Sequence, residues 1–148
     1  MIKLNLQLFG GRGSGSGKQN IQSAINNLPE HEFGRGKVLN PIPTASETVI
    51  KQANSKYFNL SDTELASRTS VDSVSVSKLE TDQEWVRKPS LLKLNENIKG
   101  NISGINTDDN VTIFKYDGHF IVFDGNHRTS LALLRNQKTI KAKVIDLD

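Results

Sequence analysis

Two apolar runs, residues 111–116 and 119–123, flank the dipeptide Asp-Gly at positions 117–118. This pattern constrains the fold more than any other stretch. Asp-Gly between strand-forming runs predicts a two-residue β-hairpin, because the twist of that turn matches the twist of the flanking strands. Both faces of the hairpin are largely apolar, so we expect its strands to lie inside a sheet that is covered on both sides.

The turn also fixes which residues of the hairpin face each other. The expected pairs are Tyr116 with His119, Phe114 with Ile121, Thr112 with Phe123, and, on the other face, Ile113 with Val122. His119 is therefore expected to make a cross-strand contact rather than to act in catalysis.

Further elements surround the hairpin. Residues 85–89 are expected to be extended, because Pro89 biases its predecessor away from the helical region. Ser90 is the expected cap of a helix that ends at Gly100, and residues 140–146 alternate as a final strand. These elements predict an α+β fold in which helices pack on a small mixed sheet with the hairpin at its centre.

A helix is predicted directly after the hairpin. Residues 123–128 read Phe-Asp-Gly-Asn-His-Arg, and Leu131 and Leu134 continue them with helical spacing. The first amides of a helix lack intrahelical partners and lie at the positive end of its dipole, which favours an anion in front of them. Arg128 adds a fork of donors suited to phosphate, and Gly125 lets the backbone approach a ligand.

The sequence Asp-Gly-Asn-His-Arg at 124–128, between a hairpin and a helix, resembles the phosphate-binding box of the ParB/sulfiredoxin superfamily, which includes ParB-like nuclease domains. The resemblance covers about residues 85–148. It implies a ParB/sulfiredoxin-like domain that binds nucleotides or phosphorylated groups at this helix start. Members differ in their reactions, so the fold predicts a phosphate site better than an activity. Sulfiredoxin chemistry is excluded, because the chain has no cysteine and Asn126 stands where that family has its reactive one.

The resemblance and the helix start together define the candidate site. The residues expected to bind phosphate or a nucleotide are Gly125, Asn126, His127, Arg128 and Thr129. The catalytic candidates are Asp124 and His127. No metal site is predicted, because Asp124 and His127 lack an obvious third ligand. A nucleotide could nevertheless bring Mg²⁺, which Asp124 would hold through water.

Asp124 and His127 also have structural interpretations. Asp124 could cap the helix by accepting the N–H groups of the residues after it. For His127, a contact with phosphate and a hydrogen bond to Asp124 remain equally open.

Residues 1–17 form a separate segment that is distinct from the predicted domain at 85–148. Residues 1–9 alternate apolar and polar side chains, which predicts a strand, and residues 10–17 are a Gly/Ser linker. The apolar residues are too few and too interrupted for a signal peptide or a membrane span. This start resembles tailed-phage minor head proteins, which implies a tethered strand that engages a phage portal or capsid protein through residues 1–9.

Residues 18–84 make up the segment between this tether and the domain at 85–148. A short helical pattern ends at Pro29, capping boxes at Thr44 and Ser61 predict two more helices, and residues 71–76 form a possible strand. The predicted helices of this segment carry no cluster of catalytic or ligand-binding side chains. We assign the segment to packing or to partner contact, between which the sequence does not decide.

Two classes of function follow. The first is a phage minor head protein, located in the virion or the host cytoplasm, that binds DNA or nucleotide phosphate without sequence specificity and has no membrane partner. The second is an enzyme, either a metal-dependent nuclease or a nucleotide-dependent phosphotransferase, that uses Asp124, His127 and Arg128. The excess of 19 basic over 16 acidic residues would help either to bind a polyanion, but it is far from a basic nucleic-acid arm.

Overall fold

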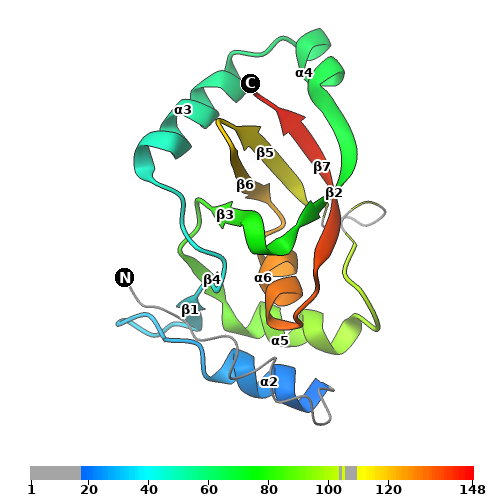
Figure 1. Ribbon diagram of the computed structural model, residues 1–148. Coiled ribbons are helices and arrows are strands. Elements are labelled where there is room, and N and C mark those ends of the chain that lie inside the picture. Colours follow the sequence, from blue (N-terminus) through cyan, green and yellow to red (C-terminus); the bar gives the residue numbers. More distant parts are fainter. Residues whose placement is uncertain (1–17, 104, 106–109) are drawn as a thin grey trace.

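The computed structural model describes residues 18–103, 105 and 110–148. Within these residues the chain forms an α+β fold with five α-helices and two sheets (Figure 1). The elements are α2 (Lys18–Asn26), β1 (Lys37–Leu39), α3 (Glu47–Phe58), α4 (Asp62–Arg68), β2 (Thr69–Ser75), the 3-10 helix η1 (Val76–Lys78), β3 (Leu79–Thr81), β4 (Trp85–Arg87), α5 (Lys88–Asn97), β5 (Thr112–Tyr116), β6 (His119–Asp124), α6 (Asn126–Leu134) and β7 (Thr139–Asp146). The predicted strand and linker at 1–17 lie outside the described residues.

The main sheet has five strands in the order β2-β7-β5-β6-β3. Strands β5 and β6 form an antiparallel hairpin, β7 is parallel to β5, β3 is parallel to β6, and β2 is antiparallel to β7. The prediction of an α+β fold with a mixed sheet around the hairpin is therefore confirmed. A second, two-stranded ribbon pairs β1 with β4 in the antiparallel direction.

The hairpin turn has positive φ at both central residues, 48° at Asp117 and 78° at Gly118. A type I′ two-residue turn requires positive φ at both of these positions. Three of the expected pairs form: Tyr116 with His119, Phe114 with Ile121, and Ile113 with Val122. The fourth prediction was wrong, because a bulge between Thr112 and Ile113 shifts the register and sets Thr112 opposite Asp124. Such an irregularity re-aims the end of a strand, and here it lies where β6 leads into α6.

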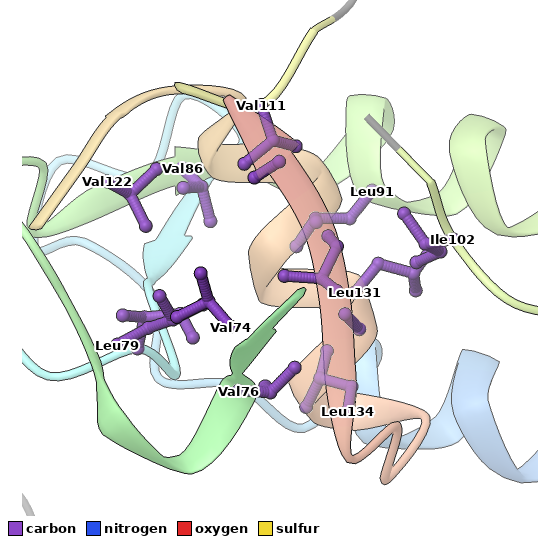
Figure 2. Packing of buried hydrophobic residues seen from close by; sticks show 14 of the residues in the cluster. Val74, Val76, Leu79, Val86, Leu91, Ile102, Val111, Val122, Leu131 and Leu134 are labelled. Atoms are coloured by element: carbon purple, nitrogen blue, oxygen red, sulfur yellow. The ribbon is translucent and has the colours of Figure 1, made fainter. Parts of the chain in front are cut away.

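One face of the sheet carries the larger core. Residues of its central strands, Ile113 and Val122 among them, pack with buried side chains of α2, α5 and α6. Figure 2 shows Leu131 and Leu134 of α6 among this set, with Leu91 of α5 close by. The predicted docking of the α6 helix through its two leucines is confirmed.

The opposite face carries a smaller core beneath α3. The Tyr57 ring of this helix lies 4.9 Å from the Phe114 ring and 5.0 Å from the Phe123 ring. Ile121 and Ile145 are buried in the same cluster. Both faces of the hairpin are thus covered, as its apolar composition predicted.

The helix starts were predicted with mixed success. The capping box of Ser61 and Glu64 is present at α4. The cap of α3 is Ser46, whose side chain accepts from the Val49 amide, whereas Thr44 makes an isolated bridge to Thr81. The predicted Thr44 cap was therefore wrong by two residues.

The prediction that Ser90 caps α5 was also wrong. This helix begins at Lys88 with Pro89 in its first turn and Arg87 at the N-cap. Proline fits the first turn of a helix, because the amide it lacks would have no intrahelical partner there.

The segment before residue 85 contributes to the same sheet. Strands β2 and β3 form its two edges, and Val74, Val76 and Leu79 are buried in the larger core. Among the described residues, no helix has the length and apolar character needed to cross a membrane.

Candidate functional site

The turn from β6 into α6 opens onto a cavity of about 370 Å³, which we call the α6 cavity. Residues 123–128 form one side of it. Gln83, from the connection between β3 and β4, and Ser90 and Leu94, from α5, form the other. The lining is mainly polar. The cavity brings the predicted junction at residues 123–128 together with two segments that lie far from it in the sequence.

Gly125 makes the turn possible. Its φ of 90° is in the left-handed region, and a Cβ at this position would lie 2.9 Å from Val111 Cγ2 and 3.0 Å from Val111 Cα. The expectation was that the glycine lets a ligand approach. The structure shows that what approaches it closely is the neighbouring backbone and side chain of Val111.

The first residues of α6 line the cavity. The first intrahelical hydrogen bond runs from the Thr129 amide to the Gly125 carbonyl at 3.0 Å, so the amides of Asn126 and Arg128 come before it. Together with the helix dipole, amides in this position favour an anion.

Asp124 is exposed at the end of β6. Its Oδ1 accepts a hydrogen bond from the Gly125 amide at 2.9 Å, and Gly125, rather than Asp124, occupies the N-cap position. Asp124 therefore stabilises the turn through one amide and does not cap the first turn of the helix.

Asn126 is only 7% exposed, and its side chain is engaged on both ends. Its Oδ1 accepts from the Thr81 hydroxyl at 2.5 Å, and its Nδ2 donates to Gln83 Oε1 at 3.3 Å. These bonds fasten the start of α6 to β3 and the residues after it, which gives Asn126 a positioning role in the wall of the cavity.

His127 lines the cavity and contacts β4. Its Nε2 accepts a hydrogen bond from the Arg87 amide at 3.1 Å, which leaves Nδ1 to carry the proton of the neutral ring. The hydrogen bond to Asp124 was one of the two predicted alternatives. The structure shows that the ring also has a backbone partner from β4.

Arg128 is the charged group most deeply buried in the described part of the chain, at 9% exposure. Its Nη1 donates to the Ser103 carbonyl at 3.2 Å, while its Nε is buried with no hydrogen-bond partner among the described residues. A buried guanidinium N–H without a partner costs free energy. The Nε of Arg128 is thus a buried donor that the described residues leave unsatisfied.

Thr129 does not line the cavity. It is fully buried, and its hydroxyl donates to the carbonyls of Gly125 and Asn126 within the helix. The neighbouring Ser130 is also buried, and its hydroxyl donates to Asn40 Oδ1 at 2.7 Å. Both hydroxyls thus stabilise the packing of α6 and are not presented to a ligand.

Sequence reasoning missed Gln83, Ser90 and Leu94 as parts of this site. Gln83 stands in a polar stretch with no motif, and Ser90 was interpreted only as a helix cap. Their position in the cavity wall depends on how β3 and α5 pack beside α6. Patterns of neighbouring residues in the sequence do not predict this packing.

Within the described residues, no three His, Asp or Glu side chains gather where they could hold a metal ion. Comparison with protein-family models, curated proteins and solved structures found no match for this chain. The cavity combines a polar lining, the first amides of a helix and a buried guanidinium. These groups suit an anion of phosphate size.

Proposed function

We propose that the α6 cavity binds a phosphate group of DNA or of a nucleotide, without sequence specificity, in a ParB/sulfiredoxin-like domain. The observation that carries this proposal is the buried Arg128, which lines the cavity and has a donor without a partner among the described residues. A phosphate in the cavity would face the Arg128 guanidinium and compensate its buried charge, because hydrogen bonds between ionised groups are stronger than neutral ones.

The carboxylate of Asp124 sets a limit on where the phosphate can lie. It lines the same cavity and repels an anion. Since the Gly125 amide already occupies one oxygen of Asp124, we place the phosphate on the side of Arg128 and the α6 amides, away from that carboxylate.

A separate observation supports binding of nucleic acid without recognition of its base sequence. An asparagine amide is the group in this cavity best suited to recognise the edge of a base. The Asn126 amide is instead engaged by Thr81 and Gln83. A ligand is therefore held through its backbone charge, which is common to all sequences.

The proposal extends to a biological setting. Residues 1–9 and the linker that follows resemble the start of tailed-phage minor head proteins, so we propose that this segment attaches the domain to a portal or capsid protein of a virion. Recovery of the protein in purified phage particles, lost when residues 1–9 are deleted, is the expected result. Equal recovery of the truncated protein would contradict it.

The phosphate site is tested with Arg128→Gln, which removes the charge but keeps a polar side chain that ends at the position of the arginine Nε. We expect affinity for a nucleotide and for short DNA to fall about 10-fold to 100-fold, since a hydrogen bond to a charged group is worth about 1.5–3 kcal/mol. Binding can be followed by ligand-dependent shifts of the melting temperature.

The matched control is Lys141→Gln, which removes the same charge from an exposed position of β7 outside the cavity. This variant is expected to bind like the parent. Equal affinity of the parent and Arg128→Gln, with both variants folded, would rule out the α6 cavity as the phosphate site.

A further inference from the structure

Three aromatic rings form a row at one end of the β1–β4 ribbon. The His31 ring lies 4.8 Å from the Trp85 ring, nearly perpendicular to it, and 5.4 Å from the Phe33 ring. Phe33 is 70% exposed, and the other two are partly exposed. We call these three residues the aromatic row.

The loop backbone holds Phe33 outward. Gly34, Arg35 and Gly36 all have positive φ, a conformation that is uncommon for a residue such as arginine. The loop is fastened by hydrogen bonds from the Gly34 amide to the His31 carbonyl at 2.8 Å and from the Lys88 amide to the Gly36 carbonyl at 2.7 Å. Figure 1 shows this loop, which precedes β1, projecting from the side of the molecule. The exposed ring is therefore preorganised, which lowers the entropy cost of binding.

Two basic side chains share the outer face of the ribbon with Trp85. Val38 and Val86 are buried, so by strand alternation Lys37, Arg87 and Trp85 lie on the opposite face. Lys37 pairs directly with Arg87 in the register, and both are exposed. Exposed rings next to positive charge are the combination that binds single-stranded nucleic acid.

The ribbon continues into the wall of the α6 cavity. Gln83, which lines the cavity, donates from Nε2 to the Trp85 carbonyl at 3.0 Å. The Arg87 amide donates to His127, which also lines the cavity. Both ends of β4 are thus hydrogen-bonded to residues of the cavity wall, which brings the cavity next to the ribbon that carries Lys37, Arg87 and the aromatic row.

We propose that the ligand of this protein is single-stranded nucleic acid, whose phosphate occupies the α6 cavity and whose neighbouring bases stack on Phe33 and Trp85. The phosphate half of this inference rests on the proposed function. A duplex keeps its bases stacked inside and offers no free face to the rings, and a single nucleotide has only one base to stack on them.

Trp85 provides a direct readout, because it is the only tryptophan of the chain. Titration of the full chain with a short oligothymidylate is expected to quench its fluorescence. The corresponding duplex, thymidine monophosphate and inorganic phosphate serve as probes of the duplex, the free nucleotide and the phosphate alone, and each is expected to bind at least about 10-fold more weakly.

The decisive variant is Phe33→Ala. Loss of one stacking ring should weaken oligothymidylate binding about 5-fold to 100-fold, leave inorganic phosphate binding unchanged, and be reversed in Phe33→Tyr. The matched control is Phe58→Ala, which removes an equally exposed ring, 72% accessible, at the end of α3. This control should bind like the parent. Both exposed positions are expected to tolerate alanine, which melting curves check.

The outcomes separate the two proposals. Weaker oligonucleotide binding in Phe33→Ala but not in Phe58→Ala supports the aromatic row, and a loss in Arg128→Gln as well supports the phosphate site. If Arg128→Gln loses binding and Phe33→Ala does not, the row is rejected while the phosphate site stands. If only Phe33→Ala loses binding, the row stands and the phosphate site is rejected. Equal binding of duplex and single strand would overturn the present inference.

Discussion

At the scale of single residues, the glycine of the Asp-Gly-Asn-His-Arg sequence has a structural reason to be glycine. Gly125 needs a positive φ to turn the chain from β6 into α6, and its missing side chain leaves room for Val111. The position therefore determines where the α6 amides point, even though no ligand atom has to touch it.

We expect Gly125→Ala to lower the free energy of unfolding by about 2–4 kcal/mol, as left-handed strain and overpacking against Val111 add up. The matched control is Gly100→Ala. Gly100 has a nearly equal φ of 86° but open space around the position of a Cβ, so only the strain of about 1–2 kcal/mol is expected. Urea denaturation measures both. Equal losses in the two variants would mean that the contact with Val111 is not limiting.

Also at the residue scale, Arg128 and Arg135, at the two ends of α6, differ in how many of their donors have partners. Arg135 donates to the carbonyls of Asn95, Ile98 and Gly100, so it stabilises the C-terminal end of α5. Burial lowers the pKa of Arg135, but a guanidinium stays charged. The donors of Arg135 are committed to α5, whereas the Nε of Arg128 has no partner among the described residues.

At the scale of elements, the helix starts depend on small differences between neighbouring cap candidates. Thr44 and Ser46 both precede α3, and the chain uses Ser46 because Thr44 is held by Thr81. Helix α4 has no such competition. Its box between Ser61 and Glu64 forms as the spacing predicts.

The α4 box should make stability depend on pH. Hydrogen bonds from the Ser61 amide and hydroxyl hold the pKa of Glu64 below its ordinary value. A carboxylate with a lowered folded-state pKa contributes stability that is present above its unfolded pKa and is lost as the pH falls through the folded one. Glu64→Gln keeps the box but has no charge to lose.

We therefore expect the parent to be more stable than Glu64→Gln near pH 7 and the two to converge as the pH falls below about 4. Melting temperatures at a series of pH values provide the comparison. A difference between parent and variant that stays constant down to pH 3 would show that the Glu64 charge contributes nothing to the cap.

At the scale of the whole molecule, the main sheet is assembled from distant parts of the chain. Its edge strands β2 and β3 come from residues 69–81, and its central strands come from residues 112–146. Ala24 and Ile25 of α2 also belong to the larger core. The part of the chain from residue 85 onward is thus covered by residues that precede it.

This arrangement predicts that a fragment of residues 85–148 does not fold cooperatively on its own. It would lack both edge strands and would expose Leu131, Val144 and other core residues that the preceding segment covers. Circular dichroism melts of the fragment and of the full chain test this expectation. A sharp transition of the fragment near that of the full chain would show that the segment 18–84 is dispensable for the core.

The sequence by itself determined the local features of this protein. The Asp-Gly turn, the register of most of the hairpin, the final strand and the α4 box follow from residues only a few positions apart. Turn chemistry, strand alternation and capping act over that range. The same local reasoning located the junction of β6 and α6, including Asp124, His127 and Arg128 in the wall of the cavity.

Only the tertiary structure decided which side chains this junction presents. Asn126 lines the cavity, but its side chain is hydrogen-bonded to Thr81 and Gln83. Thr129 bonds within its own helix, and Gln83 joins the cavity from a stretch without a motif. The aromatic row likewise combines residues 31 and 33 with Trp85, which β1–β4 pairing brings together. Contacts between such distant positions depend on how whole elements pack, and no pattern of neighbouring residues encodes that packing.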